Sequence, residues 1–261
     1  MQTIAPTYVI GDIHGQLKKL IYLLQQAHLI DADLSWSGGQ AALWFVGDFV
    51  DRGPDGIAVV DLVMRLQKEA DEAGGQVSSL LGNHEMLILA AYRFGRRSTG
   101  LGSNFISRWK RNGGIHKDIA SLNQQHLEWL AALPPMAVFQ DTLLMHADAS
   151  FYVKYGRSVK EVNETIGKLL RRSDALSWED LLDEFSRRGV FISSIGGTDY
   201  ARRYLDIFGG KQLLHGHTPI NLMRNCQPKK VTEAFVYADG LCINVDGGMF
   251  LGGPGFVYQI S

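Results

Sequence analysis

Five short motifs in this chain are built from residue types that bind metal ions. In chain order they are Gly-Asp-Ile-His-Gly at 11–15, Gly-Asp-Phe-Val-Asp-Arg-Gly at 47–53, Gly-Asn-His-Glu at 82–85, Met-His-Ala-Asp at 145–148 and Gly-His-Thr-Pro at 216–219. Carboxylates, imidazoles and one amide suit divalent metal ions, and their number suits two ions better than one. The first chemistry that the sequence predicts is therefore that of a dinuclear metal site.

In the first two motifs the acidic residues are spaced for different tasks. Asp12 and His14 are one residue apart, so in a turn both can reach one metal, although Asp12 could instead cap the following helix. Asp48 lies where a carboxylate could bridge two cations. Asp51 and Arg52 lie further round that turn and need other tasks. A surface ion pair, which contributes only about 0–1 kcal/mol, is the alternative for them.

The third motif opens a helix. The side-chain oxygen of Asn83 can bind a metal while the adjacent imidazole of His84 faces outward. Glu85 stands in the first helical turn, where a carboxylate interacts favourably with the helix dipole. That interaction is a sufficient explanation for Glu85, and we leave it out of the catalytic set.

The last two motifs supply the imidazoles that a second metal would need. A lone histidine after an apolar strand is more often a hydrogen-bonded core residue, but His146 and His217 both occur beside the other motifs, and we interpret them as ligands. Side chains alternate along a strand, so His215 should face away from His217. We therefore interpret His215 as structural.

The ordered set of motifs resembles the calcineurin-like metallophosphoesterases. It is most similar to the PPP-type serine/threonine phosphatases and their bacterial and phage relatives, and the match runs from Gly11 to about Gly248. The resemblance implies ligands for two metals: Asp12 and His14 for the first, Asp48 as the bridge, and Asn83, His146 and His217 for the second. It also implies that Arg52 binds the substrate phosphate and that His84, oriented by Asp51, protonates the leaving oxygen.

Two differences from the motifs of other family members indicate which branch of the family this chain resembles. Many phosphodiesterase relatives carry Gly-His-x-His, whereas this chain has Pro219 at the second histidine position, as in the PPP branch, which favours monoester chemistry. The His-Ala-Asp at 146–148 replaces the His-Gly-Gly of eukaryotic members and looks phage-like or bacterial. The family's second phosphate-binding arginine has no secure counterpart, with Arg202 and Arg203 as weak candidates.

The elements that must position these motifs can be read from hydrophobic periodicity. We expect strands at Tyr8–Ile10, Leu43–Val46, Val77–Leu81, Thr142–Met145, Gln212–His215, Phe235–Tyr237, Leu241–Val245 and Phe256–Ile260. Helices are expected at Gln16–His28, Gly56–Ala73 and Glu85–Phe94. Most motifs thus follow an apolar strand, and ligands at the carboxyl ends of strands in an open α/β sheet converge on one crevice.

These elements predict an α/β fold. The alternation in the first ninety residues is typical of βαβ units, and the resemblance implies a sandwich of central β-sheets flanked by helices in four layers. Helical additions are expected at about 93–133 and 159–208, forming walls around the crevice. With no repeat or linker visible, we expect a single domain over residues 1–261.

Composition is ordinary for a globular protein. Hydrophobic residues make up 46% of the 261 residues and charged residues 20%, and the net charge is −1. This balance predicts no nucleic-acid partner and no membrane partner. Two cysteines, no signal-peptide pattern and no apolar run of about 20 residues lead us to expect a cytoplasmic enzyme.

A local excess of positive charge interrupts this balance. No acidic residue occurs between Glu85 and Asp118, where seven basic residues fall. A positive rim concentrates anionic substrates, so we expect Arg96 and Arg97 to favour acidic or polyphosphorylated substrates. A solvated basic face is the alternative.

We predict a phosphomonoester hydrolase that uses two divalent metal ions to activate water. Mn²⁺ is the ion expected in vitro, and Fe, Zn, Ni or Mg would also suit the site. The substrate is expected to be a phosphoprotein or a phosphorylated small molecule, and the specific prediction is a serine/threonine or dual-specificity protein phosphatase. A dinucleoside-polyphosphate hydrolase acting on diadenosine tetraphosphate is one alternative, and a non-catalytic, metal-stabilised binding module is another.

Overall fold

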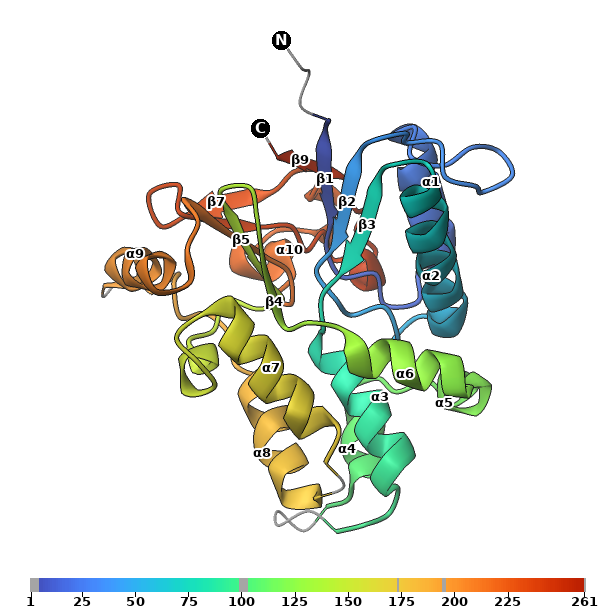
Figure 1. Cartoon of the computed structure of the whole chain (residues 1–261), viewed down its shortest axis with the longest axis vertical. Helices are drawn as coiled ribbons and strands as arrows, with labels where there is room; N and C mark the ends of the chain where they lie inside the picture. The colour runs from blue at the N-terminus through green and yellow to red at the C-terminus, as the bar shows by residue number, and fades with distance from the viewer. Residues whose placement is uncertain (1–4, 99–102, 173, 194–195, 261) are drawn as a thin grey trace.

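A computed structural model describes residues 5–98, 103–172, 174–193 and 196–260 and shows an α/β fold with two mixed sheets (Figure 1). The first sheet contains β1 (Thr7–Ile10), β2 (Ala42–Phe45), β3 (Gln76–Ser79) and β9 (Tyr258–Ile260). Its order is β3-β2-β1-β9, in which β1, β2 and β3 are parallel and β9 runs antiparallel to β1. The carboxyl ends of its three parallel strands therefore meet at one edge.

The second sheet repeats this arrangement later in the chain. It contains β4 (Met136–Phe139), β5 (Thr142–Met145), β6 (Gln212–His215), β7 (Phe235–Tyr237) and β8 (Cys242–Asn244). The order is β4-β5-β6-β8-β7, with β5, β6 and β8 parallel and the two outer strands antiparallel. Its parallel strands also end on a common edge.

The two sheets pack against each other through buried apolar side chains. The first contributes Val9, Trp44, Val46 and Leu80, and the second contributes Leu144, Leu214, Ile243 and Val245. Strands β2 and β5 are buried along their whole length, which explains their continuous apolar sequences, because each faces the other sheet on one side and helices on the other. The predicted sandwich of sheets flanked by helices is confirmed.

Helices cover the outer faces of both sheets. On the first sheet lie α1 (Leu17–Gln26) and α2 (Gly56–Glu72), and α2 packs against β3. The second sheet is contacted by α7 (Val159–Leu170) through β4 and by α9 (Gly197–Phe208) through β6. The short helix α10 (Ile220–Met223) follows the Gly-His-Thr-Pro motif.

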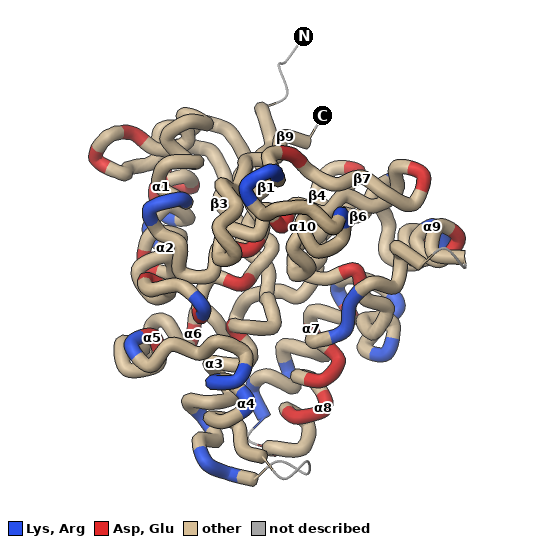
Figure 2. The backbone as a smooth tube through the Cα atoms, turned by 180° about the vertical axis from the view of Figure 1, so that it is seen from behind, with Lys and Arg blue, Asp and Glu red and all other residues tan. Residues whose placement is uncertain are grey.

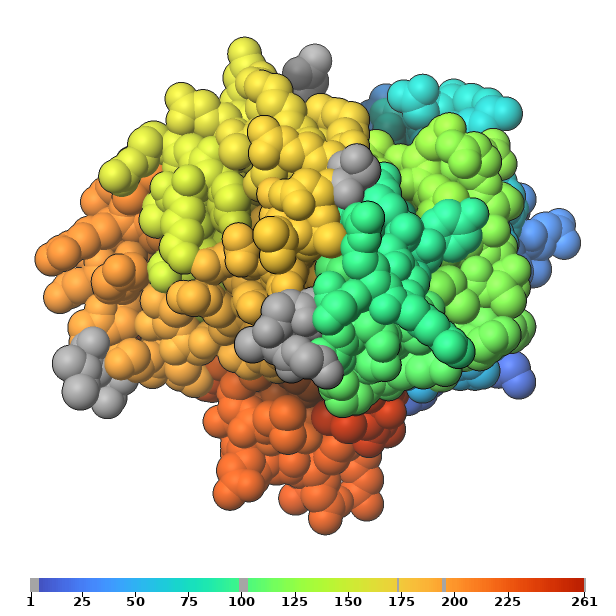
Figure 3. Space-filling model, turned by 90° about the horizontal axis from the view of Figure 1, so that it is seen from below, coloured from blue at the N-terminus to red at the C-terminus, as the bar shows by residue number. Residues whose placement is uncertain are grey.

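Six of the described helices, among them α7, form a helical body beyond the ends of the strands. It is made of α3 (Asn83–Phe94), α4 (Phe105–Arg111), α5 (His116–Ser121), α6 (Gln124–Ala132), α7 and α8 (Ala175–Phe185). Figure 3 shows α3 and α4 beside α8 on this face. Trp109 and Trp178 are fully enclosed there. Short 3₁₀ turns lie at η1 (Phe151–Lys154), η2 (Pro228–Lys230) and η3 (Met249–Leu251). None of the described helices is long and apolar enough to cross a membrane.

The boundaries differ from the predicted ones in two informative places. Helix α3 begins at Asn83 rather than at Glu85, because the Glu85 carboxylate accepts the Gly82 N–H at 3.0 Å and starts the helix two residues earlier. Strand β4 was not predicted and forms a hairpin with β5. Helices occur in both predicted insertions, although residues 99–102, 173 and 194–195 of those ranges lie outside the described residues.

Two residues of the basic segment at 93–117, whose Lys and Arg positions are blue in Figure 2, hold helices together. The Arg93 Nη1 atom donates to the carbonyl oxygens of Leu170 and Arg172, at 2.6 and 3.1 Å. Arg108 pairs with Asp183 at 2.6 Å. Structural contacts therefore account for part of this positive charge, while Arg96 and Arg97 are exposed and their effect on substrates stays a prediction.

Candidate dinuclear metal centre

The nine predicted site residues converge on the edge where the parallel strands of both sheets end. They come from the loops after β1 (Asp12, His14), β2 (Asp48, Asp51, Arg52), β5 (His146) and β6 (His217), and from the start of α3 (Asn83, His84). All are buried except Arg52, which is partly exposed. Residues more than 200 positions apart thus surround one crevice.

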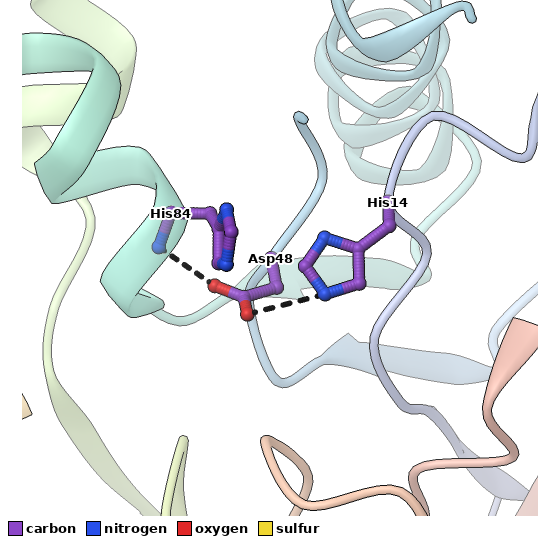
Figure 4. A group of neighbouring side chains, drawn as sticks. All are labelled: His14, Asp48 and His84. Carbon is purple, nitrogen blue, oxygen red and sulfur yellow. Dashed lines mark hydrogen bonds and ion pairs between the residues drawn. The ribbon is translucent and has the colours of Figure 1, made fainter. Parts of the chain in front are cut away.

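Asp48 lies at the centre of this group, between two imidazoles. Its Oδ2 atom is 3.5 Å from Nε2 of His14, and its Oδ1 atom is 3.4 Å from Nε2 of His146. The backbone N–H of His84 donates to Oδ1 at 2.9 Å (Figure 4). The two carboxylate oxygens therefore face different imidazoles, which is the placement expected of a bridging ligand.

On one side of Asp48 lie the predicted ligands of the first metal. Nε2 of His14 is 3.8 Å from Oδ2 of Asp12, and this Asp12 oxygen is buried without a hydrogen-bond partner. The Nδ1–H of His14 donates to the Val50 carbonyl at 3.0 Å, which leaves Nε2 as the atom with a lone pair. Arg52 Nη1 lies 2.9 Å from that Nε2.

On the other side, three ligand atoms gather around Nε2 of His146. Oδ1 of Asp48 lies at 3.4 Å, and Oδ1 of Asn83 and Nδ1 of His217 both lie at 3.1 Å. The Nδ1–H of His146 donates to the Val46 carbonyl at 2.8 Å, so this backbone contact fixes the tautomer as for His14. The group has the composition of a second metal site.

Metal-binding side chains thus form two clusters that share Asp48. Within each of the sets His14–Asp48–His84 and Asp48–His146–His217, the ligand atoms lie within 4.8 Å of one another. In the first set the Nδ1 of His84 is already hydrogen-bonded to Asp51. Asp12, whose Oδ2 atom has no hydrogen-bond partner, is therefore a better candidate than His84 to bind the first metal together with His14.

The electrostatics of the crevice favour cations. Burial, with Asp246 and Asp48 nearby, raises the pKa of Asp12 well above its usual value. Burial lowers the pKa of His14 and of His217 well below the ordinary value for histidine. Burial also acts to lower the pKa of His146, but the Asp48 and Asp12 carboxylates outweigh it and raise that pKa to about 9. Crowded carboxylates beside the neutral imidazoles of His14 and His217 fit divalent metal ions, whose positive charge would neutralise the carboxylates.

The loops carry an uncommon backbone conformation where they present these side chains. His14, Asp48 and His217 have φ values of 47°, 57° and 68°, in the left-handed region that side chains disfavour. Two glycines make room beside them, since a Cβ on Gly82 would lie 2.3 Å from Oδ1 of Asp48 and one on Gly216 would lie 2.3 Å from Oδ1 of Asp12. This strain occurs where side chains are aimed at the crevice.

His84 and Asp51 form a separate pair beside the metal ligands. Nδ1 of His84 lies 2.8 Å from Oδ2 of Asp51, and the indole N–H of Trp109 donates to the other Asp51 oxygen at 2.7 Å. Nε2 of His84 is buried without a partner. Burial lowers the pKa of His84 to about 4 and raises that of Asp51 to about 7. Trp109, on α4, shows that the helical body contributes directly to this pair.

Arg52 is held over an aromatic ring. Its guanidinium carbon lies 4.2 Å from the centre of the Phe250 ring, and its backbone N–H donates to the Gly113 carbonyl at 2.8 Å. Phe250 lies in η3, far along the sequence from the motif, and was not predicted. Stacking restricts the guanidinium to one orientation at the crevice.

The explanation of Glu85 by the helix dipole is incomplete. Its buried carboxylate accepts the backbone N–H groups of Asp48 at 2.7 Å, Phe49 at 2.8 Å and Gly82 at 3.0 Å. Glu85 therefore holds the Asp48 loop against the start of α3. The sequence could not show this, because the partners belong to another loop.

Asp246 was missed in the sequence, although it follows β8 as the other motifs follow their strands. Its Oδ1 atom accepts the Gly248 N–H at 2.9 Å, while Oδ2 is buried without a partner. Burial raises its pKa to about 7, with Asp48 contributing. The Asn-Val-Asp-Gly-Gly sequence after a predicted strand was the signal that could have identified it.

Asp148 connects the crevice to the turn that carries Arg188. It accepts the Gly189 N–H at 2.7 Å and the Tyr237 hydroxyl at 3.0 Å, and the same hydroxyl lies 2.8 Å from Nε2 of His215. His215 is thus part of a supporting network, as interpreted from the strand alternation.

The positive charge of the exposed Arg188 reaches the crevice. It lowers the pKa of both His84 and His217, although burial is the larger cause for each. Arg202 and Arg203 lie on α9 and are not among the largest causes of either shift. Arg188 is therefore a further candidate, beside Arg202 and Arg203, for a second phosphate-binding arginine.

Comparison with known proteins agrees with this geometry. The family model of the calcineurin-like phosphoesterases matches residues 5–221. The chain belongs to this family of phosphoester hydrolases, whose members use divalent metals.

Named relatives fall into two groups. Shewanella-like protein phosphatase 1 of Plasmodium berghei is 27% identical over 222 residues, which cover 80% of this chain and 60% of the relative. A symmetrical bis(5'-nucleosyl)-tetraphosphatase of Pectobacterium atrosepticum is 33% identical over 144 residues, or 55% of this chain and 42% of the relative. The chain spans 60% or less of the length of these curated relatives.

Among solved structures, the cold-active protein-tyrosine phosphatase of a psychrophilic Shewanella species has the same fold. The TM-score is 0.72 at 21% identity, and the alignment covers 99% of this chain and 76% of the other. Together with the family match, these relatives support a PPP-like phosphatase.

Proposed function

We propose that this chain is a metal-dependent phosphomonoesterase that acts on phosphorylated proteins. The observation that carries the proposal is the convergence of Arg52 and the His84–Asp51 pair on the crevice that also gathers the metal-binding side chains. A structural metal site would need neither an arginine nor an oriented imidazole. A phosphatase needs both.

In this proposal two metals share the buried carboxylate of Asp48. The first would be held by Asp12, His14 and Asp48, and the second by Asp48, Asn83, His146 and His217. When bound, such a pair supplies a water of lowered pKa and neutralises charge on the phosphate. The residues supply fixed positions, since backbone carbonyls orient His14 and His146.

The remaining groups act on the substrate. Arg52, fixed over Phe250, offers parallel N–H donors to phosphate oxygens, and Arg188 would supply a second positive charge. His84 would protonate the leaving oxygen through Nε2, while Asp51 accepts its Nδ1–H. The protonated imidazole that this requires is favoured by the negative charge of a bound phosphate.

Turnover of p-nitrophenyl phosphate tests the enzymatic proposal. We expect hydrolysis with added Mn²⁺ and none after removal of metal with a chelator. A purified protein that binds two metals yet fails to hydrolyse this substrate would favour the non-catalytic binding module instead.

A second candidate is hydrolysis of dinucleoside polyphosphates, because one group of relatives carries that name. Comparing a panel of phosphoserine, phosphothreonine and phosphotyrosine peptides with diadenosine tetraphosphate separates the two. If kcat/KM is higher for diadenosine tetraphosphate than for every peptide, the dinucleoside-polyphosphate hydrolase becomes the preferred function. The cytoplasmic location stays a prediction from the sequence.

A further inference from the structure

A separate cavity of about 320 Å³ opens between η1, the turn that carries Arg187 and one face of α9. On α9 its wall is formed by Tyr200, Arg203, Tyr204 and Ile207, whose spacing of three, four and seven residues places them on one side of the helix. Phe151 and Lys154 line it from η1. In Figure 3 the yellow-green segment after His146 and the orange α9 adjoin on the left side of the molecule.

Four cationic side chains surround the mouth of this cavity. Lys154 and Arg187 both pair with Glu184, the latter at 3.0 Å, so one carboxylate offsets two positive charges. The guanidinium groups of Arg157 and Arg203 make no ion pair with any described residue. The mouth therefore carries uncompensated positive charge although the protein as a whole has a net charge of −1.

The wall also contains apolar side chains. Phe151 and Ile207 line the cavity beside the cationic groups. They offer apolar contacts to the stems of acidic side chains whose carboxylates reach those cations.

The cavity adjoins the proposed active site along the chain. Ser150, in its lining, follows His146 by four residues, and Arg187 is the neighbour of Arg188. The Gly189 N–H donates to Asp148 at 2.7 Å, and Asp148 follows His146 by two residues, so the turn that carries Arg187 lies against the loop that carries His146. A substrate longer than a single phosphorylated residue can therefore extend from the crevice toward this cavity.

We propose that the cavity binds acidic side chains that flank the phosphorylated residue of a peptide substrate, with Arg157 and Arg203 contacting the carboxylates. This proposal rests on the proposed phosphatase function. Separated cations at an open mouth suit several carboxylates on a flexible chain.

The main test compares Arg157→Gln/Arg203→Gln with the wild-type enzyme at low salt. For a phosphopeptide with glutamates on both sides of the phosphoresidue, we expect KM to rise about tenfold, corresponding to about 1.4 kcal/mol. KM for p-nitrophenyl phosphate and for the same peptide with glutamines should stay unchanged. Arg202→Gln removes an equal charge from the same helix outside the cavity and is the matched control.

Other outcomes of the KM measurements would contradict the proposal. If KM for the acidic peptide is unchanged in the double variant, or rises equally in Arg202→Gln, the cavity does not bind the acidic side chains. If KM rises for diadenosine tetraphosphate but not for the peptide, the cavity binds a nucleotide substrate instead.

A binding assay separates this proposal from the proposed phosphatase function. Fluorescence anisotropy with the unphosphorylated acidic peptide measures binding to the cavity without catalysis. An inactive enzyme that still binds this peptide through Arg203 would contradict only the phosphatase function.

Discussion

The crevice at the strand ends and the helical body beyond it use charged residues in opposite ways. In the crevice Asp12, Asp48 and His146 are fully buried, stand next to one another and have shifted pKa values. In the helical body, Arg93 donates to carbonyl oxygens and Arg108 pairs with an aspartate at the surface. Burying a charge is costly unless it is paired and hydrogen-bonded. Several buried carboxylates crowded together in the first region therefore indicate chemistry, whereas paired charges in the second region hold helices together.

The largest effect on activity and metal binding is expected for Asp48→Asn, which alters the buried carboxylate at the centre of the crevice. Because Asp48 faces both predicted metal positions, we expect this change to remove nearly all activity and to lower the metal content. Ligand substitutions elsewhere, such as His146→Ala, should be partly rescued by excess Mn²⁺. Elemental analysis that finds two metals per chain in an inactive Asp48→Asn protein would contradict the bridging role.

The next largest effect should come from His84. We expect His84→Ala to lower kcat by about 10²–10⁴-fold with metal content near that of wild type. Since Asp51 acts through this imidazole, Asp51→Asn combined with His84→Ala should be little worse than His84→Ala alone. The loss should be smaller for p-nitrophenyl phosphate than for alkyl phosphates, and equal losses would disprove the proton-donor role.

Substitution of Asp246 tests whether a residue outside the predicted ligand set contributes to metal binding. Asp246→Asn keeps the shape and should weaken metal binding by about 10–100-fold, as removal of supporting groups around ligands does. A metal titration should show one of the two sites affected more strongly, because Asp246 contributes to the raised pKa of Asp12. Unchanged affinity at both sites would leave Asp246 as a loop-fixing residue only.

A smaller, kinetic effect is expected from Asp148. Asp148→Ala removes the acceptor of the Gly189 N–H beside Arg188, so KM for phosphate substrates should rise about threefold to tenfold, equivalent to about 1 kcal/mol. Asp148→Asn retains an oxygen for this N–H and should restore most of the lost affinity. If neither variant changes KM while both lower the melting temperature, the role of Asp148 is structural.

The smallest effect should come from the helical body. Arg93→Met keeps a long side chain beside Trp178 but loses the cation–π contact with that ring and the hydrogen bonds to two carbonyl oxygens, so the free energy of unfolding should fall by about 1–2 kcal/mol. Kinetic constants should stay at wild-type values. A change in KM without loss of stability would show that the basic segment takes part in substrate capture after all.

The sequence alone determined most of the strands, the fold class and nine of the residues that line the crevice. Metal-binding residue types follow apolar runs at Asp12, Asp48 and His146, and parallel strands bring their carboxyl ends to one edge. Short-range patterns of this kind need no knowledge of distant partners, because strand length and alternation are local properties.

Only the tertiary structure decided which distant groups support those residues. Glu85 holds the Asp48 loop, Trp109 reaches Asp51 from the helical body, and Phe250 lies under Arg52. The cavity beside α9 likewise joins segments about fifty residues apart. Such contacts depend on how loops and helices pack in three dimensions, and a single sequence carries no local signal for pairs so far apart.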